Sequence, residues 1–316
     1  MDEFELIAHY FLPLQGDDPD LLVGNGDDGA VFKLGAERVV VVVDTLVSGV
    51  HFPAHISARD IGYRAGAVNL SDIAAMGAWP RYATLALTLP EAAPAWLAAF
   101  SAGLGEALKP AGTRLIGGDT TRGSLTITLQ IIGCINGPPL TRSGARAGDL
   151  ICVSGTLGDA CAGLALCAEP PASSNQRWLI ERFLRPSARL ELGQALNSLA
   201  HAAIDISDGL LADLGHVMQA SGCRAELDVA ALPLSDALIE TVGRARAIEY
   251  ALTGGDDYEL AFAFPPTALT TVCTVAAEMG LALTVCGRVL PGSGVAALDS
   301  NGQHIELAHS GYRHFR

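Results

Sequence analysis

Aspartates recur at the ends of apolar segments throughout this chain, and any fold has to accommodate all of them. The first are the adjacent Asp27 and Asp28, which lie between glycines directly before an apolar run that begins at Val31. A single aspartate in such a place commonly does no more than cap a turn. Here the same pattern returns in both halves of the sequence. The other aspartates of this kind are Asp44, Asp72, Asp119, Asp205, Asp208, Asp256 and Asp257.

Carboxylates that a fold brings together repel one another unless cations neutralise them. A like-charged pair about 4 Å apart costs ~1 kcal/mol in water and about four times as much near a protein surface. Oxygen ligands without paired Cys or His side chains favour Mg²⁺ or Ca²⁺ over zinc. Mg²⁺ usually combines one or two carboxylates with phosphate oxygens and water. We therefore predict metal-dependent phosphoryl chemistry. The alternative is a protein that only holds Ca²⁺ in acidic loops. The sequence contains neither an EF-hand spacing nor a nine-residue calcium repeat, which argues against it.

The charged residues limit how this chain can hold phosphate. Lys33 and Lys109 are the two lysines, so eighteen of the 20 basic residues are arginines. No phosphate-binding P-loop motif is present. Phosphate oxygens must therefore meet metals, arginine such as Arg142, or the backbone amides of glycine turns such as Gly117-Gly118 and Gly254-Gly255. The net charge of −14 argues against nucleic acid as a partner.

Composition and length predict a globular protein with more than one core. Half of the 316 residues are hydrophobic and 17% are charged, which suits two domains. The seven cysteines form no C-x-x-C pair, so we expect reduced thiols and no zinc site. The longest relevant aliphatic run, residues 39–43, has the length of a strand and not of a membrane span. With an acidic N-terminus that lacks a signal-peptide pattern, we expect a cytoplasmic protein without a membrane partner.

Alternating helical and strand patterns predict an α/β (α+β) protein of two mixed domains. Glycine and proline cluster at residues 137–148, so we place the boundary there and divide the chain into residues 1–140 and 141–316. In the first half, helices are expected over 4–11, 57–67 and 94–108, and residues 69–77 either continue the second helix or start a new one. Strands are expected over 31–32, 38–43, 82–89, 113–116 and 126–135. The second half is expected to alternate strands and helices and to end in a hairpin over 295–307, around Asn301-Gly302.

Seven short motifs in a fixed order resemble the thiamine-monophosphate kinase family, within the superfamily of aminoimidazole ribonucleotide synthetase. The resemblance runs from about Phe4 to Phe315. The motifs are Gly26-Asp27-Asp28, Asp44-Thr45-Leu46, Asn69-Leu70-Ser71-Asp72, Gly117-Gly118-Asp119-Thr120-Thr121, Thr141-Arg142-Ser143-Gly144, Asp205-Ile206-Ser207-Asp208-Gly209 and Gly254-Gly255-Asp256-Asp257-Tyr258-Glu259-Leu260.

The resemblance implies an enzyme that uses ATP to phosphorylate thiamine monophosphate to thiamine diphosphate. It implies a homodimer whose N-terminal domains pair strands, with residues 1–140 binding ATP and Mg²⁺ and residues 141–316 completing the cleft. The implied ligands of several Mg²⁺ ions are Asp28, Asp44, Asp72, Asp119, Asp205 and Asp208, with Asp27 either a further ligand or only a turn residue. The implied ATP contacts are Gly118, Asp119, Arg142 and Ser207, and the implied substrate contacts are His51, Asp256 and Tyr312. The catalytic residues that the resemblance implies are Asp28, Asp72, Asp119 and Asp208.

An in-line transfer onto an already anionic phosphate needs no side-chain base and no phospho-enzyme. Two positions depart from the family pattern: Val43 replaces the usual Ser or Thr before Asp44, and residues 109–112 lack the aromatic that some relatives place near adenine. Selenophosphate synthetases carry a reactive cysteine near the N-terminus, whereas the first cysteine here is Cys134. Another ATP-using member of the superfamily and a catalytically silent Mg-nucleotide-binding protein remain the alternatives.

Overall fold

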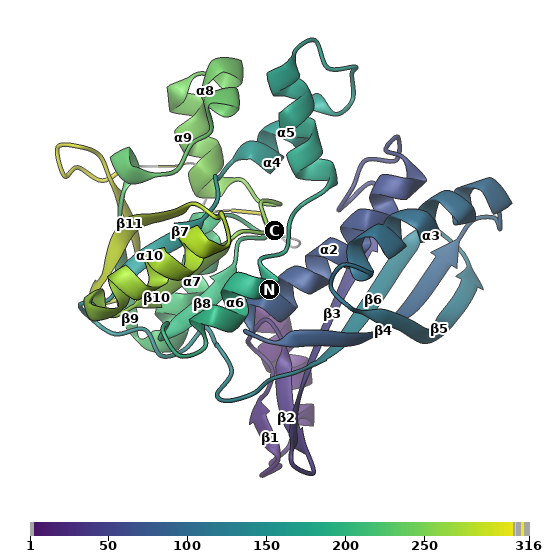
Figure 1. Ribbon diagram of the computed structural model, residues 1–316, viewed down its shortest axis with the longest axis horizontal. Helices are drawn as coiled ribbons and strands as arrows, with labels where there is room; N and C mark the ends of the chain where they lie inside the picture. Colours follow the sequence, from purple (N-terminus) through teal and green to yellow (C-terminus); the bar gives the residue numbers. More distant parts are fainter. Residues whose placement is uncertain (1–2, 306, 308–310, 313–316) are drawn as a thin grey trace.

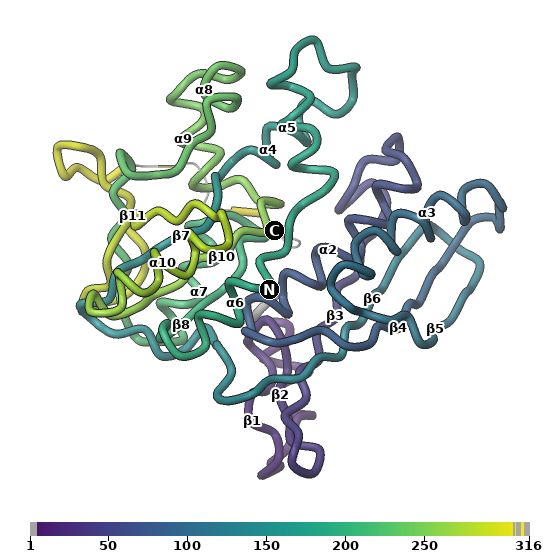
Figure 2. The backbone as a smooth tube through the Cα atoms, viewed as in Figure 1, coloured from purple at the N-terminus to yellow at the C-terminus, as the bar shows by residue number. Residues whose placement is uncertain are grey.

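The computed structural model describes residues 3–305, 307, 311 and 312. Two six-stranded mixed sheets lie side by side, one in each half of the chain, as Figures 1 and 2 show. The first sheet has the order β1-β2-β3-β6-β4-β5, in which only β4 and β5 pair in parallel. Its strands are β1 Leu21–Val23, β2 Ala30–Leu34, β3 Glu37–Val47, β4 Trp79–Leu89, β5 Arg114–Arg122 and β6 Thr126–Cys134.

Helices α2 (Ala58–Ala75) and α3 (Pro94–Leu108) cover one face of the first sheet (Figure 1). Strand β6 shows why: its residues alternate between buried and partly exposed, so that Ile127, Leu129 and Ile131 pack under the helices. The two helices approach closely at Gly62 and Gly103, where a Cβ atom would clash with the facing backbone. The opposite face of the sheet carries exposed apolar side chains such as Val43 and Tyr82.

The second sheet has the order β12-β9-β11-β7-β10-β8 and is buried on both faces at its centre. Along β10 alternate side chains enter different cores: Ala261 and Ala263 pack toward α7, while Phe262 and Phe264 pack toward α6 and α10. The last residues of α2, Ala74 and Ala75, join this second group and connect the two halves. The strands are β7 Leu150–Ser154, β8 Ala202–Asp205, β9 Cys223–Asp228, β10 Leu260–Phe264, β11 Leu283–Pro291 and β12 Gly294–Leu298.

The helices of the second half differ in length and place. The main ones are α4 Asp159–Leu166, α5 Ser174–Leu184, α6 Leu190–Leu196, α7 Leu210–Ser221, α8 Asp236–Val242, α9 Arg244–Thr253 and α10 Leu269–Glu278. Helices α4, α5, α8 and α9 pack on one another beyond the sheet (Figure 2). No helix in the described part of the chain combines the length and the apolar character that a membrane crossing requires.

The structure confirms the two mixed α/β halves and corrects several elements. In the described residues the hairpin expected over 295–307 is present around Asn301-Gly302: Leu298 and His304 form an antiparallel bridge, and the N–H groups of Asp299 and Ile305 donate to the carbonyl oxygens of Gln303 and Ala297, both at 2.9 Å. The sequence did not predict that β12 also pairs in parallel with β9. The helix expected over 4–11 consists of a short turn, α1 (Glu3–Leu6), and a π-helical turn, Ile7–Phe11. Strand β1 and helix α9 were not expected, because neither segment has a clear apolar period.

Candidate active site

A cleft of about 1820 Å³ opens between the two halves, and most of the expected site residues line it. It collects side chains from the turn before β2, from β3, from α2, from the connecting segment between β6 and β7 (residues 135–149) and from two turns of the second half. The expected residues that line it are Asp27, Asp28, Asp44, His51, Asp72, Arg142, Asp205, Ser207, Asp208, Asp256 and Tyr312.

Three aspartates meet at the centre of this cleft. Carboxylate oxygens of Asp28, Asp72 and Asp205 all lie within 4.8 Å of one another. Oδ2 of Asp28 is buried and has no hydrogen-bond partner among the described residues, although a buried carboxylate oxygen normally has one. Three converging carboxylates, one of which has an oxygen without a hydrogen-bond partner, suit a hard cation such as Mg²⁺.

Burial and mutual repulsion make the cluster hard to ionise without a cation. Burial, followed by the charges of Asp44, Asp205 and Asp28, raises the pKa of Asp72 well above its ordinary value. Burial and then the charge of Asp28 raise the pKa of Asp205 to about 8. Such shifts are typical of carboxylates that share one site. The cluster therefore gains from any cation that enters it.

Arg142 is the protein's own cation at this cluster. Its Nε donates to Oδ1 of Asp28 at 3.2 Å, and Nη2 pairs with the same oxygen. Its backbone N–H donates to both carboxylate oxygens of Asp27, at 3.2 and 3.1 Å. Asp27 also accepts the N–H of Asp28 at 3.1 Å. The carboxylate of Asp27 thus holds the Arg142 loop against the turn, which favours its role as a turn residue.

Backbone hydrogen bonds hold the remaining aspartates of the cleft. Oδ1 of Asn69 accepts the N–H of Asp44 at 3.0 Å, which ties β3 to α2. In the second half, one carboxylate oxygen of Asp213 accepts three successive N–H groups, those of Ser207, Asp208 and Gly209, at 3.1, 3.2 and 3.0 Å. Asp213 is itself buried beneath this turn. It fixes the direction in which Ser207 and Asp208 enter the cleft.

The cleft is also lined by His51, Asp256, Tyr258 and Tyr312. Nδ1 of His51 accepts the N–H of Val47 at 3.0 Å, which makes that nitrogen the unprotonated one. Asp256 and Tyr258 adopt left-handed backbone conformations, with φ angles of 73° and 50°. Non-glycine residues rarely do so, and they cluster at functional sites when they do.

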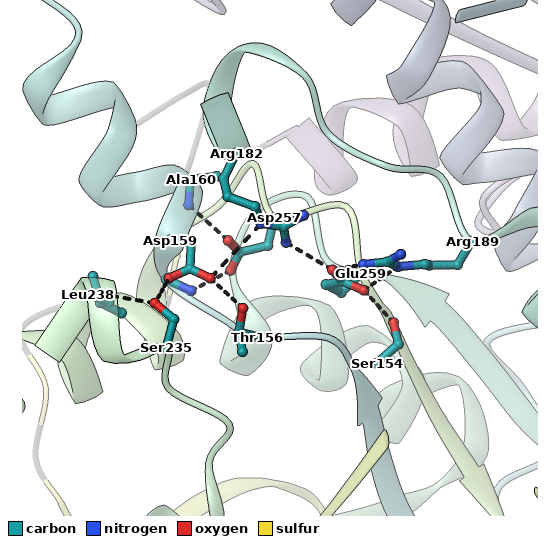
Figure 3. Close-up of polar contacts among 11 residues, drawn as sticks. Ser154, Thr156, Asp159, Ala160, Arg182, Arg189, Ser235, Leu238, Asp257 and Glu259 are labelled. Atoms are coloured by element: carbon teal, nitrogen blue, oxygen red, sulfur yellow. Dashed lines mark hydrogen bonds and ion pairs between the residues drawn. The ribbon is translucent and has the colours of Figure 1, made fainter. Parts of the chain in front are cut away.

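A buried polar network lies on the side of residues 256–259 that faces away from the cleft (Figure 3). Asp257 and Glu259 alternate along the chain with the cleft-lining residues Asp256 and Tyr258, and their side chains point away from the cleft. Asp257 accepts the N–H groups of Gly158 and Ala160 at the start of α4, at 2.6 and 3.1 Å. The alternation places two residues in the cleft and two in the network.

Glu259 is the centre of this network. It is fully buried, and its carboxylate accepts from Nη2 of Arg182 at 2.9 Å, Nε of Arg189 at 2.6 Å and the hydroxyl of Ser154 at 2.6 Å (Figure 3). Burial opposes its charge, but the two arginines outweigh burial and hold the pKa of Glu259 below its ordinary value.

Gly118 and Asp119 are the two expected site residues that the chain does not bring into its own cleft. Both lie on β5, the edge strand of the first sheet, and every residue of that strand is exposed. Asp119 lies opposite Ala86 of β4, and strands β4 and β6 separate it from Asp44 on β3. Gly118 is required where it is, because a Cβ atom there would lie 1.8 Å from the carbonyl oxygen of Leu85.

Sequence reasoning assigned no role to Arg64, Asp213, Asp257 or Glu259. Asp257 and Glu259 belong to a quoted motif, but nothing in a sequence shows which way each side chain turns. Arg64 carries a signal that went unused: it is a charged residue on the apolar, core-facing side of α2, beside Ile61 and Val68. A buried arginine normally has a carboxylate partner.

Comparisons with known proteins agree with this architecture. Residues 26–135 match the family model described as AIR synthase related protein, N-terminal domain. Residues 146–299 match AIR synthase related protein, C-terminal domain. The thiamine-monophosphate kinase of Escherichia coli (strain K12) is 44% identical over 318 residues, which cover 99% of this chain and 98% of that protein.

Solved structures give the same result. The thiamine-monophosphate kinase of Stenotrophomonas maltophilia K279a superposes with a TM-score of 0.82 at 44% identity, covering 96% of this chain and 98% of its own. The structure of AaThiL complexed with AMPPCP and TMP superposes with a TM-score of 0.86 at 33% identity, covering 99% and 97%. The resemblance inferred from the seven motifs is thereby confirmed, and the chain belongs to the thiamine-monophosphate kinase family.

Proposed function

We propose that this chain transfers the γ-phosphoryl group of ATP to the phosphate of thiamine monophosphate and so forms thiamine diphosphate. The observation that carries the proposal is the convergence of Asp28, Asp72 and Asp205, with Arg142 beside them, in a cleft between the two halves. Membership of the family supports the same reaction, and so does the related structure that holds both AMPPCP and TMP.

Mg²⁺ ions are the inferred cofactor, and the residues of the cleft suit them. Asp28, Asp72 and Asp205 would hold Mg²⁺ at the centre, and Asp44 and Asp208, which line the same cleft, are further proposed ligands. Bound Mg²⁺ would neutralise the facing polyanions and the charge that develops during transfer. Arg142, on the connecting segment, and Ser207, on the turn that Asp213 holds, are our proposed contacts to the phosphate oxygens of ATP.

The protein's own groups bind and orient the two substrates. A phosphate acceptor is already an anion, so the chemistry needs no side chain that removes a proton. His51, Asp256 and Tyr312 line the cleft and are our proposed contacts to thiamine monophosphate. Tyr312 can offer its ring face to the positive thiazolium ring. We infer a direct in-line transfer, in which phosphate is never bonded to the enzyme.

We further infer that the protein works as a homodimer. The uncovered face of the first sheet has large apolar side chains that are strongly exposed, among them Val43 at 56% and Tyr82 at 41%. Gly118 and Asp119, which the family pattern assigns to ATP and Mg²⁺, lie on the exposed edge of the same sheet. A second copy packed on this face would cover the apolar residues and could carry its own Asp119 to the cleft of its partner.

All seven cysteines are free thiols, which suits the reducing cytoplasm that we infer as the location of the protein.

The test is a reaction of purified protein with ATP, Mg²⁺ and thiamine monophosphate, followed by separation of thiamine diphosphate. Free thiamine serves as the control acceptor, since it lacks the phosphate that receives the group. Product from thiamine monophosphate alone supports the proposal. No product, or equal use of free thiamine, would overturn it. Binding of AMPPCP without any turnover would instead support the catalytically silent alternative.

A further inference from the structure

Arg64 joins the two halves of the protein where it lines the cleft. It lies on α2 in the first half and is only 1% exposed, yet its guanidinium group contacts three residues of the second half. Nη1 donates to the carbonyl oxygen of Phe183 at 2.6 Å, and Nη2 pairs with Oδ1 of Asp256. The guanidinium carbon lies 4.5 Å from the ring centre of Phe183 and 5.5 Å from that of Tyr258.

A buried guanidinium group is costly unless a carboxylate compensates its charge. Asp256 supplies that carboxylate. Burial alone would lower the pKa of Arg64, but the interactions with Asp256, Tyr258 and Asp44 outweigh burial and raise it. The side chain of Asp256 keeps 23% of its surface exposed, so its carboxylate faces Arg64 and also borders the cleft.

Asp256 has little freedom apart from this pair. Its backbone is left-handed, with a φ angle of 73°, and its N–H donates to the carbonyl oxygen of Ser207 at 2.9 Å. The backbone is therefore fixed by the turn of Ser207, whereas the direction of the side chain depends on Arg64. Phe183 and Tyr258 in turn limit where the guanidinium group can lie.

We propose that Arg64 is a positioning residue for substrate recognition: it holds the Asp256 carboxylate in the orientation that contacts the thiamine part of the substrate. The inference rests on the proposed function, since Asp256 is there assigned to thiamine monophosphate. It assigns Arg64 no contact with ATP. Substrate recognition in the second half thus depends on a charge from the first half.

Arg185 provides a matched control at the same junction. Its Nε donates to Asp60 at 3.0 Å and its Nη1 to Glu106 at 2.8 Å, so it too links the halves through ion pairs. It also stacks on a ring, that of Tyr63, at 4.9 Å. Unlike Arg64, it neither contacts Asp256 nor lines the cleft. A role in holding the halves together would therefore be shared by both arginines, but a role in orienting Asp256 would not.

The experiment compares Arg64→Met, Arg64→Lys and Arg185→Met in the full chain, with KM measured separately for thiamine monophosphate and for ATP. Loss of one partner from a buried charge pair predicts a rise of about tenfold or more in KM for thiamine monophosphate in Arg64→Met. KM for ATP should stay within about twofold, an energy difference below ~0.5 kcal/mol. Arg64→Lys keeps the charge but not the planar fork, and it should recover part of the loss. Arg185→Met should leave KM for thiamine monophosphate unchanged.

A double-mutant cycle with Asp256→Asn tests the pairing itself. Asp256→Asn alone should raise the same KM, and adding Arg64→Met should raise it by much less than the product of the single effects. Multiplicative effects, an equal rise in KM for ATP, or the same rise in Arg185→Met would overturn the inference. If Arg64→Met does not fold, Arg64→Lys and Asp256→Asn complete the cycle. Absence of turnover in the unmodified protein would reject the proposed function, whereas normal turnover with an unchanged KM in Arg64→Met would reject only the role of Arg64.

Discussion

The hydroxyl of Ser71 donates a hydrogen bond of 2.6 Å to Oδ2 of Asp205, across the junction of the two halves. Asp72 follows Ser71 on α2, and its carboxylate meets that of Asp205 in the central cluster. The hydrogen bond therefore fixes one proposed metal ligand relative to the next. It also explains why a serine directly before Asp72 is fully buried.

Asp72→Asn should abolish turnover while leaving the protein folded. The change removes one carboxylate from the Asp28, Asp72 and Asp205 cluster, so Mg²⁺ loses a ligand and the repulsion within the cluster decreases. Addition of Mg²⁺ should raise the Tm of the unmodified protein, by the equivalent of about 2.7 kcal/mol at roughly one hundred times the Kd. The variant should show little of this rise, as measured by differential scanning calorimetry.

Asp17→Asn is the control for that experiment, because Asp17 is exposed and outside the cleft. It should keep both turnover and the thermal response to Mg²⁺. Retained activity in Asp72→Asn would remove Asp72 from the metal site.

Asp119→Asn should also lose activity, although Asp119 lies outside the cleft of its own chain. If a partner copy supplies this carboxylate, a mixture of Asp119→Asn and Asp72→Asn chains should regain turnover. In a mixed dimer one of the two clefts then combines an intact Asp72 with an intact Asp119. Random mixing would restore at most about a quarter of the wild-type rate, since about half of the dimers are mixed and each has one intact cleft.

The measurement is the rate after the two variants are unfolded and refolded together, compared with each variant treated alone. The sedimentation velocity of the unmodified protein gives the oligomeric state in parallel. A monomer at assay concentration, or no recovery from a mixture in which mixed dimers are shown to form, would exclude supply of Asp119 by a partner.

Glu259→Gln should lower the free energy of unfolding by about 3–5 kcal/mol at neutral pH, because two arginines lose their buried carboxylate. The folded-state pKa of Glu259 is depressed below 4.5, so its contribution is present above that pH. It is lost as the pH falls through the folded-state value. The difference between variant and wild type should therefore shrink in acid, as measured by urea unfolding at about pH 7 and about pH 4.

Glu226→Gln is the matched control for Glu259→Gln. Its carboxylate pairs with Arg288 at 2.6 Å, but the Arg288 side chain is 62% exposed. Such a surface pair contributes at most about 1 kcal/mol. Equal losses in the two variants would mean that the buried network contributes no more than a surface ion pair.

Gly103→Ala and Gly105→Ala should have opposite effects on stability, although both glycines lie in α3. A Cβ atom at Gly103 would lie 1.7 Å from the carbonyl oxygen of Arg59 on α2, so the helices would have to separate. We expect a loss of about 3 kcal/mol or more. At Gly105 the nearest atom is Cε of Lys109 at 3.6 Å, and alanine should stabilise the helix by roughly 0.5–1 kcal/mol. Urea unfolding of both variants checks the signs, and a destabilised Gly105→Ala would contradict the account of this interface.

The sequence was sufficient for the parts of the site that local chemistry defines. Aspartates at the ends of apolar segments predicted Asp28, Asp72 and Asp205, and the structure brings these three together because α2 and β8 end at the same cleft. The direction in which each side chain points is harder to predict. The alternation from Asp256 to Glu259 depends on two left-handed residues, which no local pattern indicates.

Contacts between distant segments lay beyond the sequence as well. The partner of Arg64 is 192 positions further along the chain, so only the fold reveals the pair. The parallel pairing of β12 with β9 was likewise not predicted, because the turn signal of Asn301-Gly302 indicates only the local hairpin and not which strand lies on the other side of β12.

The central cluster takes Asp28 and Asp72 from one half and Asp205 from the other, and Arg142 comes from the segment between them. Neither half contains a complete set of ligands. A recombination event that replaced one half with the equivalent half of a relative would therefore have to match carboxylate positions, the Ser71 hydrogen bond and the Arg64 ion pair at the same time. The two halves of this protein are thus constrained to evolve together, even though each has its own sheet and its own core.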